Sequence, residues 1–263
     1  MKPTAFTRQR INILTVVAAL LAPMAMAETN GVVTAAISQA VAALDRPAQD
    51  KARDEWRKPD QLIAFAGIQP GQSVADIGPG GGYFTRIFSR VVGSTGHVYA
   101  IVPAEVLQVY AKAADGAKAI AANSAYTNVN ALTEPVARIA ADKPLDVAWI
   151  SDNYHDIYNA LGANQALAMN KAVFQALKPG GIFMVIDHVA KAGTPQESAT
   201  TLHRIDPELV KQQVLAAGFE LAGTSDILSN SADPHDVPVF SPTVRGHTDQ
   251  FVMKFRKPAN TAQ

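Results

Sequence analysis

Residues Ser73 to Thr85 read Ser-Val-Ala-Asp-Ile-Gly-Pro-Gly-Gly-Gly-Tyr-Phe-Thr, and this stretch decides the fold. A short apolar segment leads to a carboxylate, Asp76, and then to a glycine-rich turn and the start of an apolar periodic segment. Glycine at alternate positions allows positive φ and lets a ligand approach the backbone without a Cβ in the way; these glycines are Gly78, Gly80 and Gly82. The pattern predicts a strand, a ligand-binding turn and a helix.

The predicted turn favours an anionic ligand. Free N–H groups at the start of the helix, near residues 81–84, would face a phosphate or carboxylate group. Asp76, at the end of the strand, could meet a positively charged or hydroxyl-bearing part of that ligand. A dinucleotide fingerprint, G-x-G-x-x-G, needs a third glycine where this chain has Tyr83. The spacing therefore disfavours an NAD-dependent oxidoreductase.

The spacing Asp-x-Gly-x-Gly-x-Gly resembles the first motif of the class I S-adenosylmethionine-dependent methyltransferases, and the resemblance extends over most of the chain beyond it. More narrowly, Arg53-Asp54, Arg57 and Pro59 ahead of the strand, together with residues 78–82, resemble a bacterial group of exported proteins predicted to be methyltransferases. The resemblance implies S-adenosylmethionine as the cofactor. It also implies that eight residues contact the cofactor: Asp76, Gly78, Pro79, Gly80, Gly82, Tyr83, Val102 and Asp152.

One position departs from the resembled family. There the second strand usually ends in an acidic residue that holds the two ribose hydroxyls, and the aligned residue here is Val102. Glu105 is the candidate to replace that contact, and Glu134 is the candidate to meet the adenine amino group. A missing charge-assisted contact would weaken or alter binding of the ligand.

Strand-like and helix-like segments alternate along the chain, which predicts one doubly wound, Rossmann-like α/β domain over residues 61–258. An N-terminal helical segment, residues 28–60, precedes it. Seven strands are expected, mostly parallel with the last antiparallel; after the strand at Ser73 they span 97–102, 129–132, 145–150, 182–186, 219–227 and 250–255. Helices are expected at 34–44, 83–92, 106–120, 164–177 and 207–217, with a turn at 177–181.

Residues 1–27 have the order of a secretory signal peptide, with three basic residues, an apolar run at 11–22 and a small-residue site ending at Ala27. An uncleaved N-terminal anchor is the alternative, although the run is too short to span a bilayer. Cleavage would remove three of the 23 basic residues and none of the 23 acidic ones, leaving a formal charge of −3. We therefore expect a periplasmic protein with no nucleic-acid partner and no stable membrane insertion after cleavage.

The chain has no cysteine, which excludes disulfides and thiolate metal sites. A metal site built from His155, His188 and the nearby aspartates is conceivable, but no tight ligand spacing such as H-x-x-x-H supports it, so no metal site is predicted. The sequence makes no prediction of oligomeric state.

Three polar stretches should meet at one edge of the sheet, because each follows a predicted strand: residues 76–82, 152–156 and 187–188. Histidine titrates near neutrality, so His155 is the expected general base, with Asp152 or Asp156 orienting its ring. His188 and Tyr154 would hold the acceptor. The alternative is that His155 only bridges the loop to the following helix.

The sequence thus predicts an S-adenosylmethionine-dependent methyltransferase that acts on a small-molecule acceptor. The alternative is a non-catalytic periplasmic protein of the same fold that binds an adenosyl-type or other small ligand, which Val102 favours. Arg53 and Arg57 lie four apart and are expected on a solvated helix face, with contact to the ligand as the alternative. The proline-containing loop at 229–246 is expected to be a lid or a binding surface.

Overall fold

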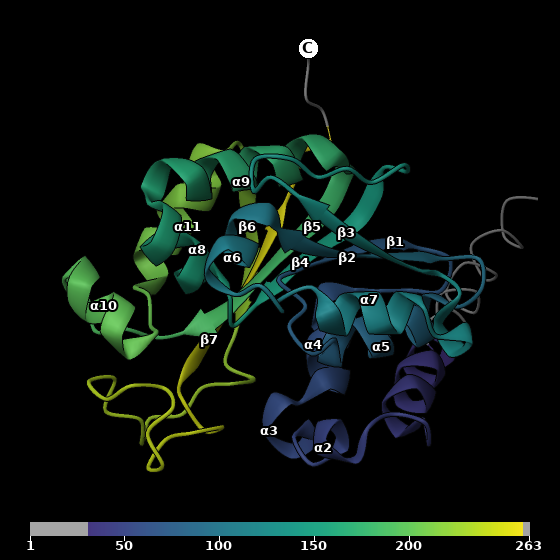
Figure 1. Ribbon diagram of the computed structural model, residues 1–263, viewed down its shortest axis with the longest axis horizontal. Helices are drawn as coiled ribbons and strands as arrows, with labels where there is room; N and C mark the ends of the chain where they lie inside the picture. The colour runs from purple at the N-terminus through teal and green to yellow at the C-terminus, as the bar shows by residue number, and fades with distance from the viewer. Residues whose placement is uncertain (1–30, 260–263) are drawn as a thin grey trace, which may run out of the picture.

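The computed structural model describes residues 31–259, so the predicted signal peptide lies outside the described residues. Its seven-stranded sheet has the order β3-β2-β1-β4-β5-β7-β6 (Figure 1). The strands are β1 (Ser73–Ile77), β2 (His97–Pro103), β3 (Val129–Glu134), β4 (Leu145–Ser151), β5 (Leu177–His188), β6 (Glu220–Ser225) and β7 (Gln250–Arg256). Strand β7 runs antiparallel to both of its neighbours, and the other pairings are parallel. The predicted mostly parallel sheet with an antiparallel last strand is confirmed.

Helices cover both faces of the sheet, because its central strands are apolar on both sides. All five residues of β1 are buried. One core forms under residues 31–42 and helices α4, α5 and α7, and a second forms under α8, α9 and α11. The helices are α2 (Ala48–Lys51), α3 (Asp54–Arg57), α4 (Pro59–Ala66), α5 (Tyr83–Val92), α6 (Ala104–Val109), α7 (Asp115–Ala121), a 3-10 turn (Ser124–Tyr126), α8 (Tyr154–Leu161), α9 (Ala163–Ala176), α10 (Gln196–Leu202) and α11 (Pro207–Ala216).

The prediction of a single helix over 106–120 is wrong. Helix α6 ends at Val109 and α7 begins at Asp115, with a turn between them. Helix α7 packs directly on the glycine-rich turn, where a Cβ on Gly116 would lie 2.5 Å from the carbonyl oxygen of Gly80. This tertiary contact fixes the position of α7, and the chain turns at 110–114 to reach it.

The turn predicted at 177–181 is instead the first part of β5. Leu177 pairs with Leu145, and the pairing then shifts register so that Val147 meets Ile182. Gly180, with a φ of +79°, donates its N–H to the carbonyl of residue 257. The glycines therefore form an irregular, bulged strand and not a separate turn.

The segment between β6 and β7, residues 226–249, lies below α10 and β7 in Figure 1 and is held by a buried ion pair. Arg204 and Asp233 make two hydrogen bonds of 2.9 Å, and both side chains are fully buried. Arg204 also donates to the carbonyls of Val189 and Val237. The segment is therefore an anchored loop.

Helix α4 begins at Pro59, whose fixed φ suits the first turn of a helix. The division of the chain near residue 60 stays a prediction. Within residues 31–259, we find no helix with the length and apolarity needed to cross a membrane.

Candidate functional site

The glycine-rich turn between β1 and α5 has the backbone that its sequence predicts. Gly78, Gly80 and Gly82 have φ values of +66°, +53° and +80°, which other residues rarely adopt. An added Cβ would meet nothing within 4 Å at Gly80 or Gly81. The turn is therefore open to a ligand at these two residues.

The rest of the turn is closed by the protein itself. A Cβ on Gly82 would lie 2.0 Å from Ile120 of α7, and one on Gly78 would lie 3.0 Å from Asn153. The Asn153 amide donates to the carbonyls of Gly78 at 2.9 Å and Ser151 at 2.8 Å. Asn153, which the sequence did not single out, thus joins the turn to the end of β4.

Asp76 faces the start of α5. Its carboxylate accepts a 2.6 Å hydrogen bond from the Thr85 hydroxyl, and the residue is 3% exposed. Burial raises the pKa of Asp76 to about 6, against the opposing effect of the hydroxyl and backbone of Thr85 and of the charge on Arg57. The Asp76 carboxylate is therefore bound to Thr85 in the first turn of α5.

Tyr83 is committed to an internal network. Its hydroxyl donates to Asp54 at 2.6 Å, and Arg46 donates to the same carboxylate at 2.7 and 2.8 Å. Tyr83 is 4% exposed. The network ties the N-terminal helices to α5. Pro79, by contrast, lies half-buried in the turn, and its carbonyl accepts the N–H of Gly82.

The expected solvated face is wrong for Arg57. Its guanidinium contacts Asp152 at 2.5 Å and the Ser151 hydroxyl at 3.0 Å, because α3 folds over the carboxyl end of β4. It also lies 4.7 Å from the centre of the Tyr83 ring. Arg53, whose side chain is 42% exposed, pairs with the neighbouring Asp50.

The two candidate replacements for the missing acidic contacts, Glu105 and Glu134, both have partners within the protein. Val102 is 2% exposed and packs in the core. Glu105 accepts the backbone N–H of Val136 through both oxygens, at 3.0 and 3.2 Å. Glu134 lies 3.6 Å from Arg138. The open backbone at Gly80 and Gly81 fits an approaching ligand, whereas the charge-assisted ribose contact has no counterpart among these residues.

His155 lies at the start of α8 with both ring nitrogens facing carboxylates. Nδ1 is 2.7 Å from Asp187 and Nε2 is 3.1 Å from Asp156. Burial alone would lower the pKa of His155, but the charges and hydrogen bonds of these two carboxylates outweigh burial and raise it to about 10. The expected orienting role of Asp156 has a matching contact at Nε2, while Nδ1 faces Asp187 and not Asp152.

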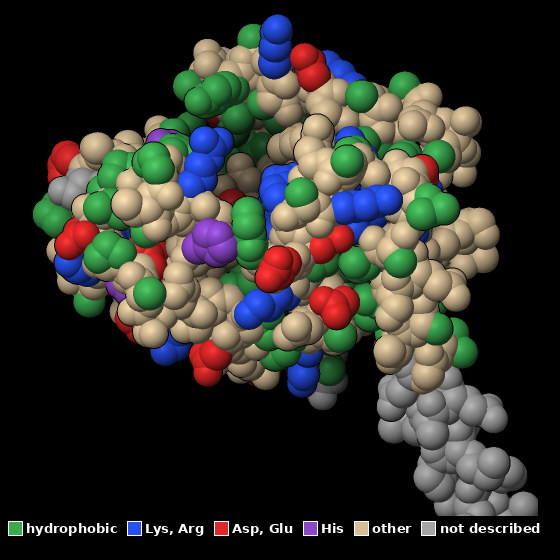
Figure 2. All heavy atoms as spheres, turned by 90° about the horizontal axis from the view of Figure 1, so that it is seen from below, with side chains coloured by type: hydrophobic (Ala, Val, Ile, Leu, Met, Phe, Trp, Pro, Cys, Tyr) green, Lys and Arg blue, Asp and Glu red, His purple; other side chains and the backbone are tan. Residues whose placement is uncertain are grey.

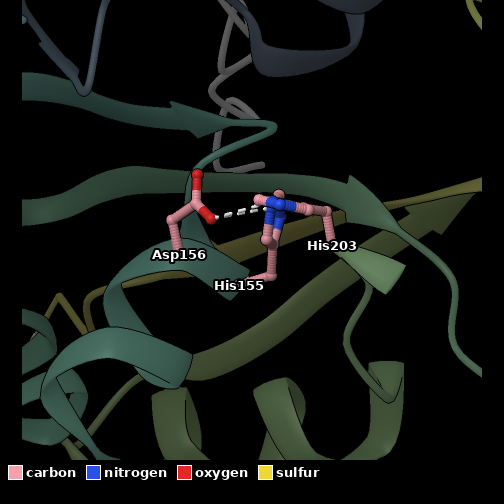
Figure 3. A group of neighbouring side chains, drawn as sticks. All are labelled: His155, Asp156 and His203. Atoms are coloured by element: carbon pink, nitrogen blue, oxygen red, sulfur yellow. Dashed lines mark hydrogen bonds and ion pairs between the residues drawn. The ribbon is translucent and has the colours of Figure 1, made fainter. Parts of the chain in front are cut away.

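Figure 3 shows a third side chain in this group, His203, which follows α10. Its Nδ1 lies 3.2 Å from the same oxygen of Asp156 that faces His155. Neither His203 nor α10 was predicted. His203 stands 47 residues from Asp156, so no local spacing points to the contact.

His188 lies beside this group, with its ring 5.8 Å from the ring of His155. Its Nδ1 is 2.7 Å from the Thr248 hydroxyl and 3.1 Å from the Gln250 amide. The Gln250 amide also donates to Asp152 at 2.7 Å. Burial lowers the pKa of His188, and the charges on Asp152 and Asp187 oppose that effect. His188 and Asp152 therefore belong to one polar cluster, as the sequence predicts.

Tyr154 does not belong to this cluster, so its expected contact with an acceptor is wrong. Its side chain is fully buried, and its hydroxyl accepts a 2.8 Å hydrogen bond from Asn170 of α9. The first turn of α8 directs Tyr154 into the core under α9, whereas the next residue, His155, faces Asp187.

One face of the molecule is hollowed. The view in Figure 2, from below Figure 1, shows a recess with Lys or Arg side chains on two sides and histidine nearby. The N-terminal helices and the loop before β7 lie on this side of the molecule (Figure 1).

Residues 60–219, more than half of the chain, match the family described as Protein-L-isoaspartate(D-aspartate) O-methyltransferase (PCMT). The curated relative "Ubiquinone/menaquinone biosynthesis C-methyltransferase UbiE" of Hydrogenovibrio crunogenus is 31% identical over 134 residues, 50% of this chain and 47% of the relative. The protein of that name from Vibrio vulnificus strain YJ016 is 29% identical over 194 residues, 73% of this chain and 64% of the relative. The chain thus spans less than two thirds of the length of either relative.

Solved structures share the fold. A SAM dependent methyltransferase from Aquifex aeolicus superposes with a TM-score of 0.56 at 20% identity, covering 82% of this chain and 96% of that chain. The cyclase SpnF superposes with a TM-score of 0.58 at 17% identity, covering 78% of this chain and 81% of that chain.

Proposed function

The chain belongs to the protein-L-isoaspartate(D-aspartate) O-methyltransferase family, and from this membership we propose that it is an S-adenosylmethionine-dependent methyltransferase acting on a small-molecule acceptor. The class I methyltransferase fold described above is the scaffold for this activity. The acceptor is the part of the proposal that the chain's own residues must support.

The donor half of the proposed site is the glycine-rich turn. Gly80 and Gly81 leave the backbone open, and Asp76 and Thr85 fix the start of α5 behind it. The bound donor supplies an activated methyl group on sulfur, so the protein needs mainly to align an acceptor with that group. In the absence of a carboxylate at Val102, the backbone of the turn would carry more of the binding than in the resembled family.

The acceptor half is the polar cluster of Asp152, His188 and Gln250. The observation that carries the proposal is the link between the two halves: Asn153, the chain neighbour of Asp152, donates to the Gly78 carbonyl of the turn and to the Ser151 carbonyl at the end of β4. A donor at the turn and an acceptor at the cluster would thus be held by neighbouring parts of one rigid edge. That is the alignment that methyl transfer needs.

His155 as the general base stays a prediction. An acceptor would have to displace Asp156 to reach Nε2, and Nδ1 is occupied by Asp187. The side chain of His188 is 14% exposed against 4% for His155. We therefore assign the direct contact with the acceptor to His188.

Exposed aromatic side chains beside the cluster support an acceptor with an apolar or aromatic body. Trp56, 42% exposed, has its ring 4.3 Å from that of His247. Phe240, 59% exposed, packs on His203 at 4.9 Å. Relatives named for ubiquinone and menaquinone biosynthesis point the same way, whereas the family description names a protein substrate.

The test begins with calorimetric titration of S-adenosylmethionine, S-adenosylhomocysteine and NAD. Gly81→Ala is the sharpest variant, since the new Cβ would clash with no protein atom and would enter the space left for the ligand. Gly31→Ala is the matched control, because that helical glycine also has open space around it. We expect micromolar binding of the first two ligands that Gly81→Ala weakens at least tenfold and Gly31→Ala leaves unchanged.

Transfer of a labelled methyl group to a panel of phenols, catechols and quinols then tests the acceptor class. An isoaspartyl peptide in the same panel tests the protein acceptor named by the family. Binding of NAD alone, or of none of the three ligands, would overturn the proposal.

A non-catalytic ligand-binding protein is the second candidate, and Val102 favours it. Donor binding without transfer to any acceptor would support that candidate. Export to the periplasm remains part of the proposal on the sequence of residues 1–27, and N-terminal sequencing of the protein from a periplasmic fraction tests it.

A further inference from the structure

We propose that His155, Asp156 and His203 bind one divalent transition-metal ion. The first two residues lie in the first turn of α8, and His203 follows the end of α10 (Figure 3). Their candidate ligand atoms all lie within 4.8 Å of one another. The proposed metal site does not include the donor turn, so it can be tested independently of the proposed methyl transfer.

The spacing of the ligand atoms fits an ion. His155 Nε2 lies 3.1 Å from Asp156 Oδ1, and His203 Nδ1 lies 3.2 Å from the same oxygen. Two ligand atoms held about 2.0–2.1 Å from a tetrahedral zinc ion are about 3.3–3.4 Å apart. Two of the three pairs of ligand atoms thus lie close to the spacing around a bound ion, and the third pair, His155 Nε2 and His203 Nδ1, lies within 4.8 Å.

The ring of His155 is held in the way that metal-binding histidines usually are. Its Nδ1 faces the fully buried carboxylate of Asp187 at 2.7 Å. The other Asp187 oxygen accepts the backbone N–H of His155, also at 2.7 Å. A carboxylate behind the ring fixes its tautomer and orientation, so that Nε2, which faces Asp156, can bind the ion once its proton is released.

The other two side chains provide access. Asp156 is 50% exposed and His203 is 38% exposed, while His155 is 4% exposed. An ion would thus be bound by one buried ligand, His155, and two partly exposed ligands, Asp156 and His203, with positions left for water or another ligand. His203 is packed against Phe240, which limits the orientations of its ring.

The charge and type of the ligands favour a transition metal. Asp156 and Asp187 place two carboxylates beside the imidazole rings, so that an ion would replace the proton at Nε2 of His155. The nearby guanidiniums of Arg57 and Arg204 are paired with other aspartates, Asp152 and Asp233. Two imidazole nitrogens and one carboxylate oxygen suit zinc, cobalt, nickel or iron better than magnesium or calcium, which prefer oxygen. A hydrogen-bonded network without an ion is the competing interpretation, and it predicts no such affinity.

The experiment titrates chelator-treated protein, carrying no histidine tag, with Co²⁺ followed by visible absorption and with Zn²⁺ followed by calorimetry. We expect one ion per chain with micromolar or tighter affinity. His203→Asn keeps a side chain that tolerates the positive φ of +54° at this position and should weaken binding about 10–100-fold. Asp156→Asn should weaken it by a similar factor.

His235→Asn is the matched control. His235 also has a positive φ, +61°, and also faces a single carboxylate, Asp249, at 2.9 Å, but it belongs to no such three-residue group within the described residues. This variant should bind metal like the parent protein. Parent affinity weaker than millimolar, or equal affinity in His203→Asn and the parent, would overturn the proposal whatever the donor titration gives.

Discussion

Nδ1 of His155 lies 2.7 Å from one oxygen of Asp187, and the other oxygen accepts the backbone N–H of His155 at 2.7 Å. The backbone N–H of His188 donates to the first oxygen at 2.8 Å. A single buried carboxylate therefore fixes the start of α8, the ring of His155 and the end of β5 relative to one another.

Replacing Asp187 by asparagine should destabilise the protein by about 1–3 kcal/mol, because an amide cannot accept all three hydrogen bonds and a buried donor is left unpaired. Urea unfolding followed by circular dichroism measures the loss. Asp156→Asn is the comparison, since its half-exposed carboxylate should contribute at most about 1 kcal/mol. Equal losses in the two variants would contradict the anchoring role of Asp187.

Asp76→Asn should stabilise the protein at pH 8. Because the folded pKa is raised from 3.8 to about 6, the folded state binds more protons than the unfolded state between these values, and wild-type stability falls as pH rises through this window. Above it, the buried charge costs up to about 3 kcal/mol, which asparagine removes. Urea midpoints at pH 8 and below pH 4 should show a gain that disappears in acid. A variant less stable than the parent at pH 8 would mean that the charge is stabilising.

Gly116→Ala should destabilise the protein by about 1–3 kcal/mol, because its Cβ would lie 2.5 Å from the carbonyl oxygen of Gly80. Replacing glycine by alanine inside an exposed helix ordinarily stabilises a protein by about 1 kcal/mol, so a loss of stability in Gly116→Ala would reveal the close contact. Gly31→Ala, with open space around it, should show the ordinary gain in stability. Thermal unfolding of both variants checks the prediction, and a gain in both would show that α7 does not press on the turn.

Arg204→Met should cost about 3–5 kcal/mol, since it leaves the fully buried Asp233 without its partner. Limited proteolysis should then cut within residues 226–249, which the pair anchors. Lys191→Met breaks an exposed pair to the same loop, with Asp236, and should change stability by at most about 1 kcal/mol. Similar proteolysis of both variants would show that the loop is held by other contacts.

The sequence predicted the features that depend on neighbours along the chain. The positive φ of Gly78, Gly80 and Gly82 follows from alternate glycines at a strand end, and helix 83–92 and the apolar strands follow from periodicity. The polar cluster of Asp152 and His188 was expected because parallel strands end at one edge of the sheet. Each of these inferences needs only local pattern and topology.

Contacts between distant segments were not predictable in this way. The break between α6 and α7 depends on the close packing of Gly116 against Gly80, and the spacing of apolar residues along the chain does not predict such a contact. Arg57 was assigned to a solvated face because it lies four residues from Arg53, yet it reaches Asp152 across the fold. His203 meets Asp156 through a helix that the sequence did not predict.

The position of β7 in the sheet determines when the polar cluster of Asp152, His188 and Gln250 can form during folding. This strand is the last of the seven in sequence but lies between β5 and β6, and its Gln250 together with Thr248 just before it reaches His188. During synthesis β6 emerges before β7, so β6 and the edge of β5 that faces away from β4 stay unpaired until β7 enters between them. A nascent chain arrested before residue 248 would carry the whole glycine-rich turn and two of the three residues of the polar cluster, and insertion of one strand would add the third, Gln250.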